Sequence, residues 1–262
     1  MEAFRRDGTR PIAIIGAMDV ETNVLESFIK DATVADFGQY RFVEGRIFDL
    51  PVVLGRSFIG MTNSAAVAAI AATQYNPLFV ISEGTAGGHN PSLHRGDIVI
   101  GRAVKHIHYI YTQKRARGEG SNPATWSFSG PEMVFENGAI EERNTLHCDP
   151  ALVKAASLTP YERGSVIRGV IGSGDLWNRE ADRIMMFHDK MGTDCEDMES
   201  FAVAQVCHQL RFPSLSIRVI SNSEVHPEEE YVRAIGEDCQ RFVLSFLETN
   251  QDSIRQMASQ AK

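Results

Sequence analysis

Residues 11–18 read PIAIIGAM, an almost uninterrupted apolar run of strand length that ends in small residues. A continuous Ile-rich or Val-rich run, as opposed to an alternating one, is typical of a strand covered on both faces. Five further runs of this kind recur along the chain, at 51–57 (PVVLGRS), 78–88 (LFVISEGTAGG), 96–104 (GDIVIGRAV), 165–175 (SVIRGVIGSGD) and 213–223 (PSLSIRVISNS). These segments are predicted to be the central strands of one sheet.

Helix-like segments separate the apolar runs, at 21–30, 64–74, 150–157, 179–191, 199–210 and 231–248. Such alternation predicts an α/β fold with a mixed, mainly parallel central sheet. No stretch resembles a linker, so we expect one domain over residues 1–262. Segment 105–147 interrupts the rhythm and is interpreted as an excursion over the active face. Its His106 and His108 have no third ligand at a recognisable spacing, so no metal site is predicted.

The composition restricts the classes of partner. A net charge of −8 argues against binding to nucleic acid or to an anionic membrane, because either surface needs clustered Lys and Arg. The chain has 4 widely spaced cysteines without a C-x-x-C pair, which indicates a reduced, cytoplasmic protein. No secretory signal follows the N-terminus, and no apolar run reaches the roughly 18 residues of a membrane span. Neither secretion nor membrane insertion is expected.

Polar residues stand where the first and third apolar runs end, and ligands of α/β folds bind beyond the carboxyl ends of strands. Asp19 and Glu21 follow the first run, either as ordinary first-turn acids or as site residues. The third run ends in SEGTAGG, residues 82–88, where Gly84 and Gly87 leave backbone N–H groups and the Thr85 hydroxyl for a ligand. A plain turn fits this segment equally well. It has neither the Lys of a P-loop nor the G-x-G-x-x-G pattern, so nucleotide phosphate binding is not supported.

Two later runs end in an aromatic residue and in a set of polar residues. Trp177 follows the fifth run and either stacks on a base or packs in the core. A buried Arg218 in the sixth run needs an anionic partner, for which Glu21 and Glu199 are the candidates, in a structural ion pair or in a site. The residues that share one face of this strand at period two are Arg218, Ile220, Asn222 and Glu224.

Taken in order, these motifs resemble those of the nucleoside phosphorylase and nucleosidase superfamily, and among its members the 5′-methylthioadenosine/S-adenosylhomocysteine nucleosidases. The resemblance covers about 11–248 and is weak only over 105–147. It implies a single three-layer, phosphorylase/hydrolase-like domain, a homodimer, and no metal or organic cofactor. The motifs are GAM-x-x-E (16–21), GMTNSAAVAAIAAT (60–73), GTAGG (84–88), L-x-x-GDIV (93–99), GSGD-x-aromatic (172–177), DMES-x-A-x-A-x-V-C (197–207) and R-x-I-S-polar (218–222).

The same comparison separates hydrolysis from phosphorolysis. Phosphorylases of this superfamily hold phosphate with arginines at the end of the first strand and before the Gly-rich turn, where this chain has Asp19, Glu21 and Glu83. Carboxylates repel phosphate but can orient and deprotonate water. The resemblance therefore implies a purine nucleosidase that hydrolyses the N-glycosidic bond of methylthioadenosine-type and adenosylhomocysteine-type nucleosides to adenine and the thioribose. A phosphate-dependent purine nucleoside phosphorylase and a non-catalytic nucleoside-binding relative are the alternatives.

Cleavage of an N-ribosyl bond passes through a state in which the sugar becomes positive and the purine negative, so an enzyme can help at the water, the ribose and the base. By resemblance, Glu21 is the base for water, aided by Thr85 and Arg218, and Glu199 accepts hydrogen bonds from the ribose hydroxyls. The other implied contacts are Gly87 in the Gly-rich turn, Met198 under the ribose, Trp177 stacked on the base, the backbone of Asn178 at the base edge, and Met18 and Tyr231 around the 5′-alkylthio group.

Asn222 departs from the family, which has Asp at this place to protonate purine N7. A carboxamide donates a hydrogen bond but cannot deliver a proton. Either Asn222 acts by hydrogen bonding alone, or Glu224 supplies the acid, or the protein does not catalyse the reaction. The acid-rich segment DCEDMESF, residues 194–201, receives one functional assignment, Glu199. Asp194, Glu196 and Asp197 are interpreted as solvated or helix-N-terminal charge.

Overall fold

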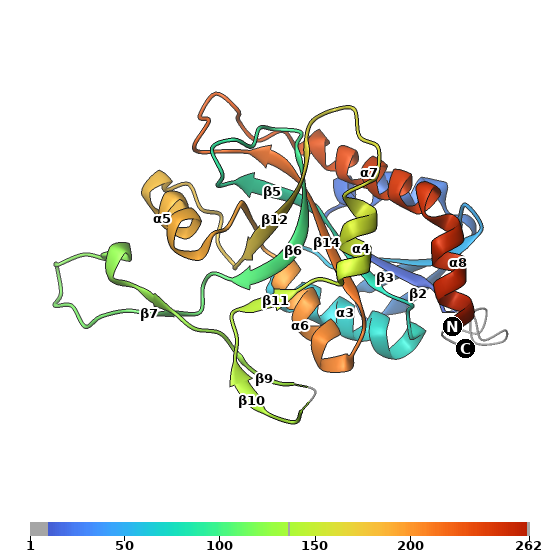
Figure 1. The fold of residues 1–262 in the computed structure, drawn as a ribbon, viewed down its shortest axis with the longest axis horizontal. Coiled ribbons are helices and arrows are strands. Elements are labelled where there is room, and N and C mark those ends of the chain that lie inside the picture. Colours follow the sequence, from blue (N-terminus) through green and yellow to red (C-terminus); the bar gives the residue numbers. More distant parts are fainter. Residues whose placement is uncertain (1–9, 136, 261–262) are drawn as a thin grey trace.

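A mixed β-sheet forms the centre of the computed structural model, which describes residues 10–135 and 137–260 (Figure 1). The strands of the large sheet are β1 (Ile12–Gly16), β2 (Lys30–Phe37), β3 (Tyr40–Ile47), β4 (Leu50–Arg56), β5 (Val80–Gly88), β6 (Ile98–His106), β11 (Thr145–His147), β12 (Val166–Ser173), β13 (Cys195–Asp197) and β14 (Ser214–Asn222). Their order is β11-β6-β12-β13-β5-β1-β4-β3-β2, and β14 pairs with both β5 and β6. The six predicted strands are confirmed as β1, β4, β5, β6, β12 and β14.

The expectation of a mainly parallel sheet is corrected by the strand pairing. Five pairs are parallel and five are antiparallel. The antiparallel share comes largely from 30–47, which the sequence pattern did not assign to strands. There β2 and β3 form a meander with β4, and β2 is mostly exposed, so its polar residues gave no apolar run.

Helices cover both faces of the sheet (Figure 1). They are α2 (Asn23–Phe28), α3 (Met61–Tyr75), α4 (Pro150–Ala156), α5 (Ala181–Met191), α6 (Ser200–Leu210), α7 (Gly236–Thr249) and α8 (Gln251–Gln260), with short 3-10 turns η1 (Asp19–Glu21), η2 (Pro123–Thr125) and η3 (Arg233–Ile235). Local chemistry explains their ends: Asp149 caps α4 by accepting from the N–H groups of Ala151 and Leu152, and Pro150 follows at the first helical position.

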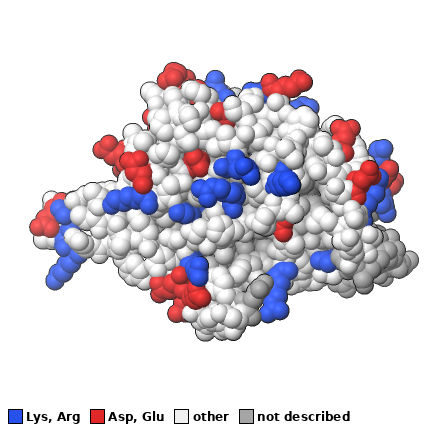
Figure 2. Space-filling view, in the orientation of Figure 1, with Lys and Arg blue, Asp and Glu red and all other residues white. Residues whose placement is uncertain are grey.

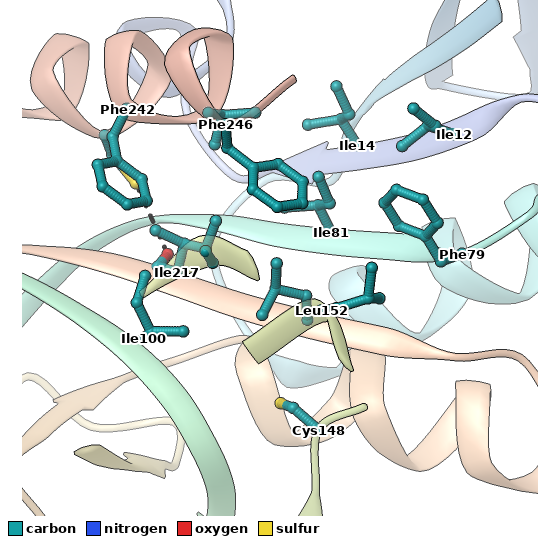
Figure 3. Close-up of a cluster of buried hydrophobic side chains, with 14 of the residues drawn as sticks. Ile12, Ile14, Phe79, Ile81, Ile100, Cys148, Leu152, Ile217, Phe242 and Phe246 are labelled. Atoms are coloured by element: carbon teal, nitrogen blue, oxygen red, sulfur yellow. Dashed lines mark hydrogen bonds between the residues drawn. The ribbon is translucent and has the colours of Figure 1, made fainter. Parts of the chain in front are cut away.

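The period-two alternation of β1 divides the core into two apolar layers. Ile12 and Ile14 belong to the cluster that contains Phe242 and Phe246 of α7, as the close-up in Figure 3 shows. Ala13 and Ile15 point the other way, into a cluster formed with α3 and α6. Each buried Phe of α7 contributes about 1.5–3 kcal/mol by leaving water. Both faces of the first strand are therefore buried, as its continuous apolar run indicates.

Segment 105–147 contains two small hairpins that project from the domain. They are built from β7 (Ile110–Tyr111) with β8 (Ser127–Phe128) and from β9 (Glu132–Val134) with β10 (Ile140–Glu142), and Figure 1 shows them as arms beside the main body. Large apolar side chains on these arms are exposed, among them Tyr111 and Ile140.

Both basic and acidic side chains occur on the face shown in Figure 2. Within the described residues, every helix is too short or too polar to cross a bilayer. Cys148, Cys195, Cys207 and Cys239 are all buried free thiols.

Candidate active site

A cavity opens at the carboxyl ends of β1, β5 and β14, where the strand pattern placed the polar residues. Its volume is about 640 Å³, including space that is open to solvent, which suits a small organic ligand. It is lined by Ala17, Met18, Glu21, Ile59, Thr85, Ala86, Gly87, Leu176, Trp177, Asn178, Glu196, Asp197, Met198, Glu199, Ser221, Asn222 and Tyr231. All of the predicted site residues except Arg218 and Glu224 lie on this lining.

Glu21 lines the cavity and is buried. One carboxylate oxygen accepts from the backbone N–H of Thr85 at 2.8 Å and from its hydroxyl at 2.9 Å, and the other accepts from the N–H groups of Ala17 and Met18 at 3.2 and 3.0 Å. Gly84 permits this approach, because a Cβ there would stand 2.9 Å from the Glu21 carboxylate. Four donors thus hold one carboxylate in a fixed orientation.

Glu83 lies behind this site, fully buried, and neither of its carboxyl oxygens has a hydrogen-bond partner. Burial raises the pKa of Glu83 well above its ordinary value, and the nearby Glu21 carboxylate raises it further. The raised pKa favours the uncharged form of Glu83, which weakens its repulsion of an anion. Asp19 is half-exposed and paired with Arg233. Of the three carboxylates expected to repel phosphate, Glu21 is the one that lines the cavity.

The anionic partner of Arg218 is Asp197, which corrects two expectations. Arg218 Nε lies 2.7 Å from Asp197 Oδ2 and its Nη2 lies 3.9 Å from Glu199 Oε2, with the Arg218 side chain 1% exposed. Asp197 is buried, not solvated: it also accepts from the hydroxyls of Ser173 and Ser200 and from the N–H of Ser200 at the start of α6. Because Arg218 is enclosed by these groups, it supports the cavity wall from behind instead of lining it.

Glu199 faces the cavity at the start of α6. Its Oε1 accepts from the N–H of Gly60 at 3.1 Å, and its Oε2 accepts from the N–H of Met198 at 3.2 Å. Burial raises the pKa of Glu199 to about 8, reinforced by the Asp197 carboxylate and opposed by the Arg218 guanidinium. Near neutral pH the Glu199 carboxyl group can therefore both donate hydrogen bonds to the hydroxyl groups of a ligand and accept hydrogen bonds from them.

The aromatic rim of the cavity consists of Trp177 and Tyr231, whose ring centroids lie 5.3 Å apart in an edge-to-face arrangement. Trp177 is 57% exposed, so the core-packing interpretation of this residue is wrong. Asn178 is buried next to it; its Oδ1 accepts from the N–H of Glu180, and its Nδ2 has no hydrogen-bond partner. An aromatic face beside an unpartnered amide is suited to a planar heterocycle.

Asn222 and Glu224 separate in space although they share a strand face. Asn222 lines the cavity, and its Oδ1 accepts from the Ser221 hydroxyl at 2.9 Å. Glu224 lies outside the lining, in an adjoining hollow, where its carboxylate is 2.7 Å from Nε of the exposed Arg179. A shift in the pairing register with β5 falls between Ile220 and Asn222, so the simple alternation does not continue to Glu224.

Sequence reasoning missed Glu196 and His89. The segment read as a helix entrance forms the short strand β13, antiparallel to β5, and this pairing sets Glu196 opposite Gly87 on the cavity lining. The Glu196 side chain is 11% exposed, so its assignment to solvated charge is wrong. Asp194 is likewise engaged, accepting from the Val170 N–H and the Asn90 amide. Only the position of Glu196 directly before Asp197 in an acid cluster hinted at a role.

No group of three or more His, Cys, Asp or Glu side chains in the described parts of the chain is arranged to hold a metal ion. His106 and His108 are partly buried, and burial lowers the pKa of each below its ordinary value. They are therefore mainly neutral at neutral pH.

Comparisons with known proteins agree with this geometry. The family model of the phosphorylase superfamily matches residues 11–256. A 5′-methylthioadenosine/S-adenosylhomocysteine nucleosidase of Bacillus thuringiensis (strain Al Hakam) is 31% identical over 215 residues, which are 80% of this chain and 85% of the relative, and that of Bacillus anthracis matches equally.

Solved structures share the fold. The Neisseria meningitidis 5′-methylthioadenosine/S-adenosylhomocysteine nucleosidase in complex with methylthio-immucillin-A is 24% identical, with a TM-score of 0.74 over 92% of this chain and 99% of that one. Futalosine hydrolase of Helicobacter pylori strain 26695 is 20% identical, with the same TM-score and coverage. From the superfamily match and the Bacillus relatives, the chain belongs to the phosphorylase superfamily and, within it, to the 5′-methylthioadenosine/S-adenosylhomocysteine nucleosidases.

Proposed function

We propose that this protein is an N-glycosyl hydrolase that cleaves methylthioadenosine-type and adenosylhomocysteine-type nucleosides into the purine and the 5-thioribose. The observation that carries the proposal is the Glu21 carboxylate, which lines the cavity and is fixed by four donors. Among the described residues that line this cavity, none is Lys or Arg. A carboxylate without a free cation beside it favours water over phosphate as the attacking group.

In the proposed reaction, Glu21 removes a proton from water while the water oxygen forms a bond to C1′ and the bond to the purine breaks. Each of the four lone-pair positions of the Glu21 carboxylate accepts a hydrogen bond, three of them from backbone N–H groups and one from the Thr85 hydroxyl. The Thr85 hydroxyl is the one donor that can rotate. We infer that it turns away to release a lone pair to the water, and then accepts a hydrogen bond from the same water.

The ribose and its 5′ substituent occupy the cavity between the carboxylates and the rim. Glu199 accepts hydrogen bonds from the ribose hydroxyls, and Met198 packs under the sugar. Arg218 steadies Glu199 from behind through Nη2, which lies 3.9 Å from Oε2. Met18, Ile59 and Tyr231 supply apolar or aromatic surface for an alkylthio group, and all three line the cavity.

The purine lies against the Trp177 ring, next to Asn178 and Asn222. Stacking of this kind contributes about 0.5–1.5 kcal/mol beyond area burial. The backbone of Asn178 reads the base edge, and Gly87 keeps the opposite wall flat because it has no side chain. We further propose a cytoplasmic homodimer; the exposed apolar side chains Phe58 and Ile59 next to the cavity support a subunit contact there.

The decisive test is base release from methylthioadenosine, adenosylhomocysteine, adenosine and inosine, with and without phosphate, followed by chromatography. We expect phosphate-independent release of adenine from the two thio nucleosides. Glu21→Gln should reduce release by at least a hundredfold, because the water loses its base. Strict dependence on phosphate would sink the proposal, and binding without turnover would favour a nucleoside-binding protein.

A further inference from the structure

The leaving purine needs a proton, and neither residue considered from the sequence supplies one. Nitrogen N7 accumulates negative charge as the glycosidic bond breaks. Asn222 lines the cavity, but a carboxamide has no proton to transfer. Glu224 is held outside the cavity by Arg179. Another acid on the cavity lining is therefore required if the base is to leave as a neutral molecule.

Glu196 is on that lining and lies beside Asn222. Both side chains approach the same point: a Cβ on Gly87 would be 3.8 Å from Asn222 Nδ2 and 3.9 Å from Glu196 Cγ. The Ser221 hydroxyl occupies Asn222 Oδ1, so the Nδ2 group is left to face the base edge. A purine that accepts a hydrogen bond from Asn222 would thus have the Glu196 carboxyl within reach of the same edge.

A buried histidine backs Glu196. The His89 side chain is 0% exposed, its Nε2 lies 3.2 Å from Glu196 Oε2, and its Nδ1 lies 2.8 Å from the Thr193 hydroxyl oxygen. Burying an acid next to an imidazole costs free energy that an apolar pair would not cost. The arrangement is a row of side chains in which Thr193 is hydrogen-bonded to His89, and His89 lies against the Glu196 carboxyl group that lines the cavity.

We propose that Glu196 is the general acid that protonates the leaving purine, with His89 as its positioning residue; this rests on the proposed hydrolytic function. The protonated Glu196 carboxyl transfers its proton to N7 as the electron pair of the C1′–N9 bond moves onto the purine. The carboxylate that forms accepts a hydrogen bond from His89 Nε2–H. In this arrangement the Thr193 hydroxyl donates to Nδ1, which leaves Nε2–H to point at Glu196. Glu196 regains a proton from solvent after the purine leaves.

Other titratable groups around Glu196 do not compete for this role. Burial lowers the pKa of His108, which follows β6, and this effect outweighs the opposite effect of the Glu196 carboxylate. His108 is therefore mainly neutral at neutral pH. Burial raises the pKa of the adjacent Cys195 thiol well above its ordinary value. Asp197, next in sequence, is engaged by Arg218. Of these groups, the Glu196 carboxyl, positioned by His89, is thus the one placed to deliver a proton to the edge of the base.

The test compares two substrates that differ only in the leaving group. Methylthioadenosine needs a proton on its base, whereas the 4-nitrophenyl glycoside of 5-methylthioribose releases a phenolate that needs none. Glu196→Gln should lower kcat on methylthioadenosine by about 10²–10⁴ relative to kcat on the nitrophenyl glycoside. Glu21→Gln should lower both rates alike, because both need activated water. An equal loss on both substrates in Glu196→Gln, or no loss on either, overturns the assignment.

Three further variants test the acid and its support. The double variant Glu196→Gln/Asn222→Asp should have a kcat on methylthioadenosine at least tenfold higher than that of Glu196→Gln alone, because it returns a carboxyl group to the same edge of the base. His89→Leu should lower kcat on methylthioadenosine more than kcat on the nitrophenyl glycoside, because the Glu196 side chain loses the group that positions it, and His89→Gln should lower it less. An equal effect of His89→Leu on both substrates refutes the positioning role. If wild-type protein hydrolyses neither substrate, the proposed function fails, and the acid assignment fails with it.

Discussion

Asp197→Asn should destabilise this protein strongly, because it leaves a buried guanidinium without its main counter-charge. The substitution preserves the shape of the side chain and removes only its charge. Arg218 is 1% exposed, and its Nε lies 2.7 Å from the Asp197 carboxylate. Among the described residues, one other carboxylate is paired with Arg218, that of Glu199, which is 3.9 Å away.

The magnitude follows from the cost of a broken buried ion pair, which is about 3–5 kcal/mol. Two effects reduce it. The Asn oxygen can still accept from the N–H of Ser200 at the start of α6, and loss of the Asp197 charge lowers the pKa of Glu199, which then pairs more fully with Arg218. We therefore expect a loss of about 3 kcal/mol in the free energy of unfolding, at the lower end of that range.

Urea denaturation at pH 7, followed by circular dichroism, measures this loss. Asp149→Asn is the matched control, because Asp149 also caps a helix through its carboxylate but is not paired with a buried cation. Asn is as good a cap as Asp, so the control should change the unfolding free energy by less than about 0.5 kcal/mol. Equal effects of the two substitutions would falsify the account of Arg218.

Three further predictions concern the site. Gly84→Ala should lower kcat at least tenfold without unfolding the protein, because its Cβ would stand 2.9 Å from the Glu21 carboxylate; initial rates of adenine release and a thermal melt check this, and an unchanged kcat contradicts it. The pKa of Glu199 is raised from 4.5 to about 8 in the folded protein, so the stability from its protonated form is complete below pH 4.5 and is lost as the pH rises through 8. The unfolding free energy should accordingly fall between pH 5 and 8 in wild-type protein and less so in Glu199→Gln, as urea titrations at several pH values can measure; parallel curves would contradict the assignment. Glu224→Gln should leave kcat on methylthioadenosine within about twofold of wild type, since its carboxylate pairs with Arg179 outside the cavity, and a loss of a hundredfold or more would return the acid role to Glu224.

The sequence could predict those site residues that lie within or directly after a strand with a continuous apolar run. Glu21 is five residues beyond the end of β1, and the Gly84–Thr85 turn lies within β5, so a continuous apolar run is enough to locate both. The β2 and β3 strands could not be found in this way. The edge strand β2 is mostly exposed, and β3 is largely buried but has charged residues among its apolar ones, so neither forms a continuous apolar run.

By itself, the sequence determined the alternation of buried strands and helices, the polar strand ends and the carboxylates Glu21 and Glu199, because these follow from local patterning and motif spacing. Only the tertiary structure decided how the charges pair. Asp197 and Arg218 are 21 positions apart, and they meet because β13 and β14 both pair with β5. The same antiparallel placement of β13 brings Glu196 into the cavity beside His89, and a register shift in β14 leaves Glu224 outside. The pairing of strands that are distant in the sequence decides which carboxylates line the cavity, and this pairing cannot be read from the residue types alone.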